Sequence, residues 1–215
     1  MDLRGFVEAH LPGAPARVLE VGCGHGELAR AIAALGYAVV AIDPDAPEGD
    51  LFQAVSLEEF ADPGPFDAIV ANRVLHHVAD LPRALDKVAN LLGSEGRLIL
   101  HEHAFDRVDE PTARWYLEQR AAAGPGAPPS LESCLAEWED DHAGLHGYAA
   151  MREELDRRFT ERFFAWTPYL YGGLGGSADL EREEQALIDA AAIQATGFLY
   201  VGTTGRPDGP IDGPI

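Results

Sequence analysis

The sequence predicts an α/β protein built on a doubly wound, mostly parallel sheet of seven strands. Short apolar runs alternate along the chain with stretches whose apolar residues recur at helical spacing. A glycine-rich turn at residues 22–26 directly follows the first of these runs. Of the 215 residues, 47% are hydrophobic and 24% are charged, which is typical of a globular protein. We expect residues 1–215 to form a single domain.

The first β-α-β unit lies in residues 17–43. Residues 17–23 (RVLEVGC) predict a strand, and the following segment, 27–36, predicts a helix with its apolar side chains on one face. Gly36 suits the end of that helix, where a left-handed backbone is favoured. Residues 37–43 (YAVVAID) then predict a second, fully buried strand.

The same alternation continues to residue 105. A weaker segment, residues 50–56, predicts a short third strand, and residues 66–74 (FDAIVANRV) predict the fourth. Asp80 is placed to begin a helix that Gly93 would end. Residues 96–105 (GRLILHEHAF) predict the fifth strand. Strands that alternate with helices in this way favour a parallel sheet covered on both faces.

The character of the chain changes after the fifth strand. Residues 106–160 predict a helical insertion that forms a lid, and residues 161–204 predict the C-terminal strands and helix. Tyr169 and Tyr171 are expected to alternate onto one face of a strand. The tail, residues 205–215, repeats DGPI and is expected to be loose. The predicted elements of this half are helices at 109–123, 130–142, 147–160 and 177–194, and strands at 161–172 and 197–204.

The charge balance limits the classes of partner. The chain carries 36 acidic and 16 basic residues, a formal net charge of -20, which repels phosphate backbones and anionic lipid. We therefore expect neither a nucleic acid nor a membrane as partner, and no segment is apolar for long enough to span a bilayer. Cys23 and Cys134 are distant in sequence and form no metal-binding or disulfide pattern. With no signal peptide evident, a cytoplasmic location is predicted.

The glycine turn carries the strongest functional signal. Gly22, Gly24 and Gly26 alternate in EVGCGHG at the end of the first strand, where backbone without a β-carbon lets a ligand approach closely. A dinucleotide fingerprint, G-x-G-x-x-G, would need a glycine at the position of Glu27. The spacing therefore disfavours an NAD(P)-dependent oxidoreductase, the first alternative function.

The segment VLEVGCGHGELA resembles motif I of the class I S-adenosylmethionine-dependent methyltransferases, and the resemblance extends over about residues 17–105. It implies a Rossmann-like methyltransferase fold in which residues 1–105 bind S-adenosylmethionine. In that family Glu20 would lie near the methionine amino group, and the loop that includes Gly22, Cys23, Gly24 and Gly26 would line the cofactor.

Six further residues are expected to complete the cofactor site. Asp43, followed by Pro44, ends the second strand, where nucleoside-binding folds place an acid on the ribose hydroxyls; a loop-starting acid is the alternative. Ser56 and Leu57 resemble the region at the adenine edge, although an S-x-x-E helix start explains Ser56 equally well. The resemblance also implies that Asn72, at the end of the fourth strand, and His77, after it, contact the cofactor.

Histidines supply the candidates for catalysis. His101 and His103 lie on one face at the end of the fifth strand, where an acceptor should bind, and a neutral imidazole suits proton removal. The pair also suggests a metal, but no third ligand is evident and we predict no metal. His76 and His77 resemble a common family stretch, LHH, and holding the loop is their simpler explanation.

These features predict an enzyme that methylates an O or N atom of a small molecule, with secondary metabolism as one source of the acceptor. Aromatic residues of the insertion would cover an apolar acceptor. The sequence leaves open a non-methylating enzyme that uses S-adenosylmethionine, and a non-catalytic protein that binds it. It does not identify the acceptor or the oligomeric state.

Overall fold

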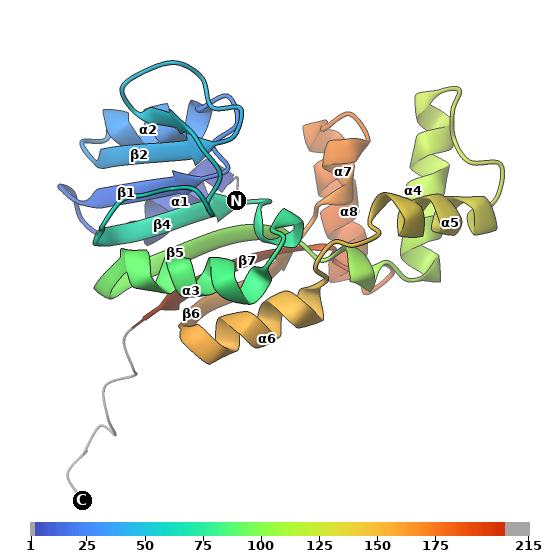
Figure 1. The fold of residues 1–215 in the computed structure, drawn as a ribbon. Coiled ribbons are helices and arrows are strands. Elements are labelled where there is room, and N and C mark those ends of the chain that lie inside the picture. Colours follow the sequence, from blue (N-terminus) through green and yellow to red (C-terminus); the bar gives the residue numbers. More distant parts are fainter. Residues whose placement is uncertain (1–2, 205–215) are drawn as a thin grey trace, which may run out of the picture.

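A seven-stranded sheet forms the centre of the molecule, which we describe from a computed structural model over residues 3–204 (Figure 1). The strand order is β3-β2-β1-β4-β5-β7-β6. Strands β1 to β5 pair in parallel, and β7 is antiparallel to both β5 and β6. This arrangement confirms the predicted mostly parallel, doubly wound sheet. The strands are β1 (Arg17–Val21), β2 (Ala38–Asp43), β3 (Phe52–Ala54), β4 (Phe66–Asn72), β5 (Leu92–His103), β6 (Thr160–Thr167) and β7 (Gly197–Thr203).

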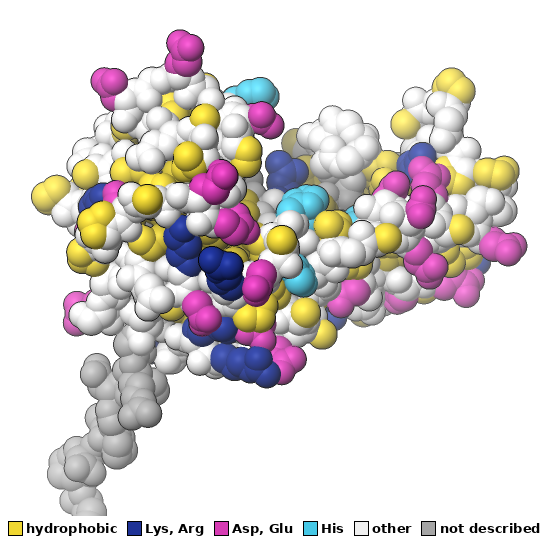
Figure 2. All heavy atoms as spheres, in the orientation of Figure 1, with side chains coloured by type: hydrophobic (Ala, Val, Ile, Leu, Met, Phe, Trp, Pro, Cys, Tyr) yellow, Lys and Arg dark blue, Asp and Glu magenta, His cyan; other side chains and the backbone are white. Residues whose placement is uncertain are grey.

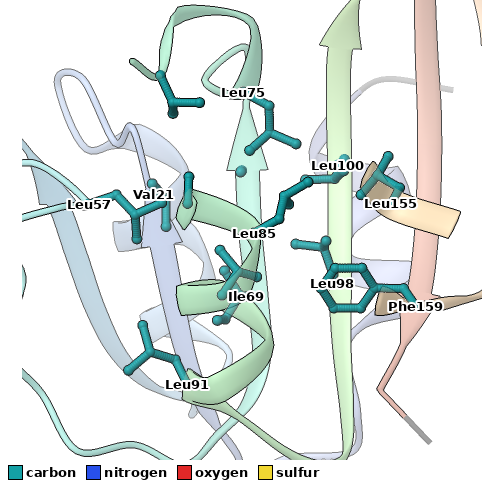
Figure 3. Packing of buried hydrophobic residues seen from close by; sticks show 14 of the residues in the cluster. Val21, Leu57, Ile69, Leu75, Leu85, Leu91, Leu98, Leu100, Leu155 and Phe159 are labelled. Carbon is teal, nitrogen blue, oxygen red and sulfur yellow. The ribbon is translucent and has the colours of Figure 1, made fainter. Parts of the chain in front are cut away.

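Helices cover both faces of this sheet. On one face, α1 (Leu3–His10) and α2 (Glu27–Ala34) bury side chains such as Phe6 and Ile32. On the other face, α3 (Leu81–Leu91) and α6 (Tyr148–Arg158) pack beside each other. The core beneath them includes Ile69, Leu85 and Leu155 (Figure 3). Because apolar side chains on both faces of the central strands need cover, these two helical layers follow from the apolar runs in the sequence.

Asp80 and Gly36, two residues predicted to lie at helix ends, do so in the structure. The side chain of Asp80 accepts a hydrogen bond from the backbone N–H of Arg83 at 3.0 Å, which caps α3. Gly36, with φ of 92°, follows the last turn of α2. The turn between α3 and β5 differs from expectation, since β5 begins at Leu92, directly after the helix.

Four helices gather beyond the carboxyl end of β5, to the right of the sheet in Figure 1. Their own small core includes Trp115, Leu170 and Ile193. They are α4 (Glu110–Ala123), α5 (Leu131–Asp141), α7 (Leu170–Gly173) and α8 (Ala178–Asp189). Because α6 belongs to the sheet layer, with Met151 and Leu155 fully buried, only α4 and α5 of the predicted insertion stand away from the sheet. The lid prediction therefore concerns these two helices alone.

The strand predicted over residues 161–172 is too long at its end. β6 stops at Thr167, and the short helix α7 follows, so Tyr169 and Tyr171 do not alternate along a strand. Pro168 comes directly after Thr167 and lacks the N–H that a continued strand would need. The repeated DGPI tail, residues 205–215, lies outside the described residues, and its predicted looseness stays a prediction.

None of the helices within residues 3–204 is both long and apolar enough to cross a membrane. Over the same residues, no group of three or more His, Cys, Asp or Glu side chains is arranged to hold a metal ion.

The burial of leucines predicts where the sheet is sensitive to substitution. Leu85 of α3 is fully buried against the sheet, whereas Leu35, at the end of α2, is 46% exposed. We expect Leu85→Ala to lower the free energy of unfolding by about 2–5 kcal/mol, because it leaves a cavity in the core. Leu35→Ala is the matched control and should change it by less than about 0.5 kcal/mol. Urea denaturation of both variants measures the difference, and equal costs would contradict the assigned packing.

Candidate functional site

The glycine loop between β1 and α2 adopts a backbone that suits glycine. Gly22 has φ of 75°, Gly24 of 50° and Gly26 of 80°. A β-carbon on Gly22 would lie 2.3 Å from Cγ2 of Val74, whereas one on Gly24 would meet no atom within 4 Å. Gly22 is therefore required by close packing against the turn after β4, and Gly24 faces open space that a ligand can occupy. Gly26 serves the entry into α2, where Phe52 leaves no room for a side chain.

Glu20, near the end of β1, has a buried carboxyl group with an unsatisfied oxygen. Its side chain is 3% exposed, and Oε2 has no hydrogen-bond partner in the described structure. Burial raises the pKa of Glu20 to about 8, although a hydrogen bond from the backbone of Ala29 acts in the opposite direction. A buried carboxyl without a full set of partners is costly to folding, so its presence beside a glycine loop indicates a ligand with a complementary donor.

Asp43 connects the end of β2 to the glycine loop. Its Oδ2 accepts a hydrogen bond from the backbone N–H of Gly24 at 3.0 Å, and its Oδ1 accepts one from Asp45 at 2.9 Å. The carboxylate thereby fixes the loop at the carboxyl end of the sheet. This contact was not predicted, and it leaves the side chain half-buried beside a cavity.

Cavity A lies at the carboxyl ends of β1, β2 and β4 and has a volume of about 360 Å³. Most of the residues predicted to bind the cofactor line it: Gly22, Asp43, Pro44, Ser56, Leu57, Asn72 and His77. Ser56 is also engaged locally, since its hydroxyl accepts a hydrogen bond from the N–H of Glu59 at 3.2 Å. Both explanations of Ser56 therefore find support, because it belongs to an S-x-x-E turn and also to the cavity wall.

Cavity B, of about 530 Å³, adjoins cavity A on the side of the glycine loop. Cavities A and B share the lining residues Gly22, Asn72, Arg73 and His77. Glu20, predicted to lie near the methionine amino group, lines cavity B, as do the predicted cofactor residues Cys23 and Gly24 of the loop. Gly26 lines neither cavity. The sequence did not single out Arg73, whose φ of 58° is left-handed, an unusual conformation for a residue other than glycine.

Cavity C, of about 360 Å³, lies between the end of β5 and helices α4 and α5. It shares His76, His77 and Tyr169 with cavity B, so the two spaces meet at these side chains. Figure 2 shows histidine side chains at the hollow between the sheet and the group of four helices. His77 lines all three cavities, which places the turn after β4 at the centre of the site.

Glu102 holds that turn in place. Its side chain is fully buried, and its Oε1 accepts hydrogen bonds from the backbone N–H groups of Val74 at 2.7 Å and Leu75 at 2.6 Å. Its Oε2 accepts one from Nδ1 of His76 at 2.6 Å and one from the N–H of His103 at 3.2 Å. Strand alternation in the sequence places Glu102 on the opposite face from His101 and His103. A carboxylate that follows the apolar residues Leu98, Ile99 and Leu100 was the available signal.

The two histidines predicted as catalytic have different surroundings. Nδ1 of His101 donates to Oδ1 of Asn72 at 2.9 Å, and His101 lines none of the cavities A, B and C. His103 lines cavity C and stacks on Tyr169, with ring centroids 4.0 Å apart. Burial lowers the pKa of His101 to about 4 and that of His103 to about 2, so both rings are neutral at physiological pH.

A second buried carboxylate sets the position of Tyr169. Glu184 of α8 is fully buried, and its two oxygens accept hydrogen bonds from the N–H groups of Tyr169, Leu170 and Tyr171 at 2.8, 3.1 and 2.8 Å. These contacts replace the strand pairing that was expected here. Through Tyr169, a side chain on α8 thus shapes the wall shared by cavities B and C.

The buried carboxyl of Glu20 predicts a gain in stability on its removal. Because its pKa in the folded protein, about 8, lies above the usual 4.5, its contribution is fully present below pH 4.5 and is lost as the pH rises through 8. Glu20→Gln should therefore be more stable than the wild type at pH 9. The free energy of unfolding of the variant minus that of the wild type should be about 2–5 kcal/mol larger at pH 9 than at pH 4.5. Denaturation at a series of pH values measures this, with Glu118→Gln, at an exposed position of α4, as control. A difference that stays constant with pH would contradict the assignment.

Comparisons with known proteins agree with this geometry. A family described as "Methyltransferase domain" matches residues 3–161. The ubiquinone biosynthesis O-methyltransferase of Xylella fastidiosa is 36% identical over 111 residues, covering 44% of this chain and 45% of that protein. Its counterpart in Xanthomonas campestris is 42% identical over 106 residues, with 42% and 43% covered. The matched part thus covers less than half the length of each of these curated relatives.

Solved structures share the fold. An S-adenosylmethionine-dependent methyltransferase from Mesorhizobium loti superimposes with a TM-score of 0.60 at 16% identity, covering 92% of this chain and 95% of the other. The 1,6-didemethyltoxoflavin-N1-methyltransferase of Burkholderia thailandensis gives 0.56 at 18% identity, covering 94% and 76%. Together with the family match and the glycine loop, they lead to one conclusion: the chain belongs to the class I S-adenosylmethionine-dependent methyltransferase family.

Proposed function

We propose that this protein transfers a methyl group from S-adenosylmethionine to an O or N atom of a small molecule. The observation that carries the proposal is the buried carboxyl of Glu20, whose Oε2 has no partner among the described residues, beside an open glycine loop and in a cavity that meets a second, histidine-lined space. The first feature fits a ligand with an ammonium group, and the second offers room for an acceptor.

The residues present fit the cofactor along its length. Glu20 would accept hydrogen bonds from the ammonium group, while Gly24 leaves open space for the methionine part and Gly22 and Cys23 line the same cavity. Asp43 keeps lone pairs free beside cavity A for the ribose hydroxyls. The adenine end would meet Pro44, Ser56 and Leu57, and the reacting end would meet Asn72 and His77.

The chemistry requires alignment more than acid or base strength. S-adenosylmethionine supplies an electrophilic methyl group on a positively charged sulfur. Cavity C adjoins this region, and we propose that the acceptor binds there with α4 and α5 as its lid. Exclusion of water by such a lid favours a reaction in which charge disappears.

A hydroxyl or ammonium acceptor must also lose a proton. His101 and His103 are the candidates predicted from the sequence, but only His103 lines cavity C, and burial makes both rings weak proton acceptors. We propose instead that His76 receives the proton at Nε2. Its Nδ1 already donates to Glu102 at 2.6 Å, so the imidazolium formed would be paired with a carboxylate.

Other features support the wider proposal. Relatives are named for transfer to oxygen and to a ring nitrogen, which agrees with either atom as acceptor. The net charge of -20 disfavours nucleic acid, and Cys23 and Cys134 are free thiols, in keeping with a reducing, cytoplasmic location. An acceptor from secondary metabolism remains part of the proposal.

Methyl transfer from isotopically labelled S-adenosylmethionine tests the function. We expect incubation with panels of phenols, alcohols and amines to give S-adenosylhomocysteine and a product that carries the label, both detected by mass spectrometry. Consumption of S-adenosylmethionine without a labelled methyl product would favour the non-methylating alternative. Binding without turnover of any acceptor would favour a non-catalytic protein.

Cofactor binding should release a proton. At pH 7 the raised pKa keeps Glu20 mostly protonated in the free protein, and binding of an ammonium group requires the carboxylate. Calorimetric titration with S-adenosylhomocysteine in two buffers of different ionisation enthalpy should report about one proton released per complex. The affinity should rise with pH between 6 and about 8. Glu20→Gln should abolish the release and weaken binding, and an unchanged release would contradict the role of Glu20.

The base assignment predicts a separate loss of turnover. Once an acceptor is identified, His76→Gln should lower kcat by about 100-fold and leave the affinity for S-adenosylhomocysteine within about twofold of the wild type. His10→Gln, on α1 and outside the three cavities, is the control. If His103→Ala lost the acid limb of the pH-rate profile while His76→Gln kept it, the prediction from the sequence would hold and His76 would be excluded.

A further inference from the structure

The wall of cavity C is rich in aromatic rings from four different elements. Tyr116 of α4 and Trp138 of α5 meet edge to face with centroids 5.5 Å apart. On the side of the sheet, the rings of His103 and Tyr169 are parallel to within 6°. A cavity of about 360 Å³ with such planar walls fits a compact aromatic molecule, because ring surfaces pack well against one another.

The charges around the cavity disfavour an anion. Among residues 3–204, the one lysine or arginine that lines it is Arg120, which is already paired with Glu137 at 2.8 Å and also donates to the carbonyl of Gly126. Asp141 adds a negative charge at the exposed edge. An acceptor with a carboxylate or phosphate would therefore find repulsion and no free cation.

The inner end of the cavity also lacks a partner for a cation. The carboxylate behind His76 and His103 is Glu102. Its Oε1 accepts hydrogen bonds from two backbone N–H groups, and its Oε2 accepts one from His76 and one from a further backbone N–H. An ammonium group placed here would lose its hydration without gaining an ion pair. The inner end therefore favours a neutral polar group.

One fully buried polar atom at this end has no hydrogen-bond partner among the described residues. His103 is 4% exposed, lines cavity C, and its Nε2 is buried without a hydrogen bond in the described structure. A neutral imidazole nitrogen either donates or accepts, depending on the tautomer. A hydroxyl group can satisfy both cases, whereas a carboxylate only accepts and an ammonium only donates.

We infer that cavity C binds a neutral phenol, with the ring among Tyr116, Trp138 and Tyr169 and the hydroxyl group on Nε2 of His103. The inference rests on the proposed function, because it names the class of acceptor for the same site. Burial lowers the pKa of His103 to about 2, so its ring stays uncharged. An uncharged ring agrees with a neutral hydrogen-bond partner.

Four probes with the same ring test the inference: 4-methylphenol, toluene, 4-methylbenzoate and 4-methylbenzylamine. Calorimetric titration uses the full chain saturated with S-adenosylhomocysteine, so that no turnover occurs. We expect 4-methylphenol to bind at least tenfold more tightly than each of the other three. Tighter binding of the amine or of the benzoate would overturn the inference, as would equal binding of toluene.

A substitution at His103 separates hydroxyl recognition from general packing. In His103→Leu, the affinity for 4-methylphenol should fall at least tenfold and approach that for toluene. The affinity for toluene should stay within about threefold, and thermal unfolding should show that the variant folds, since the change removes an unsatisfied buried nitrogen. His10→Leu, outside the cavity, is the matched control. Unchanged affinity for 4-methylphenol in His103→Leu would overturn the assignment.

The same titrations distinguish the two levels of proposal. If S-adenosylhomocysteine binds to the wild type and 4-methylphenol does not, the phenol inference fails while the cofactor assignment stands. If S-adenosylhomocysteine itself does not bind, the proposed function fails first.

Discussion

The buried carboxylate of Glu102 is the interaction on which the rest of the site depends. It lies near the carboxyl end of β5 with no exposed surface, and four hydrogen bonds join it to the turn after β4 and to His76 and His103. A charge in that position is tolerated only because every bond is made. The turn it holds carries His77, which lines all three cavities. One side chain of β5 thus sets where the cofactor space ends and the acceptor space begins.

Glu184 repeats this arrangement from a different element. Its carboxylate accepts the three N–H groups at the start of α7, and so determines where Tyr169 meets His103. Glu184 accepts only backbone N–H groups, and Glu102 accepts three backbone N–H groups and Nδ1 of His76. Neither carboxylate accepts from the ring of His103, whose pKa burial lowers to about 2, so that ring is neutral. Beside Tyr169, cavity C therefore presents the neutral ring of His103, whereas the cofactor side presents Glu20 and Asp43.

Local signals explain how much of this the sequence could predict. Apolar runs, the cap at Asp80 and the glycine loop each depend on neighbours in the chain, and the corresponding elements of the sheet form as expected. The continuation of β6 through Tyr171 was wrong because Glu184, a distant residue, competes for the backbone N–H groups of that segment. The same limit applies to Glu102, whose partners at Val74 and His76 become visible only when β4 and β5 are paired.

The turn after β4 also connects the cofactor side of the site, cavities A and B, to the acceptor side, cavity C. Asn72 is fixed by His101, and Arg73 adopts a left-handed backbone while its N–H donates to the carbonyl of His101 at 2.8 Å. Gly22 touches the same turn, since a β-carbon there would strike Val74. A shift of this turn would therefore move the walls of cavities A, B and C together. Because the residues of this turn cannot relax independently, the same contacts set the geometry of the cofactor and of the acceptor. A site that must align a methyl group with its acceptor gains from that rigidity.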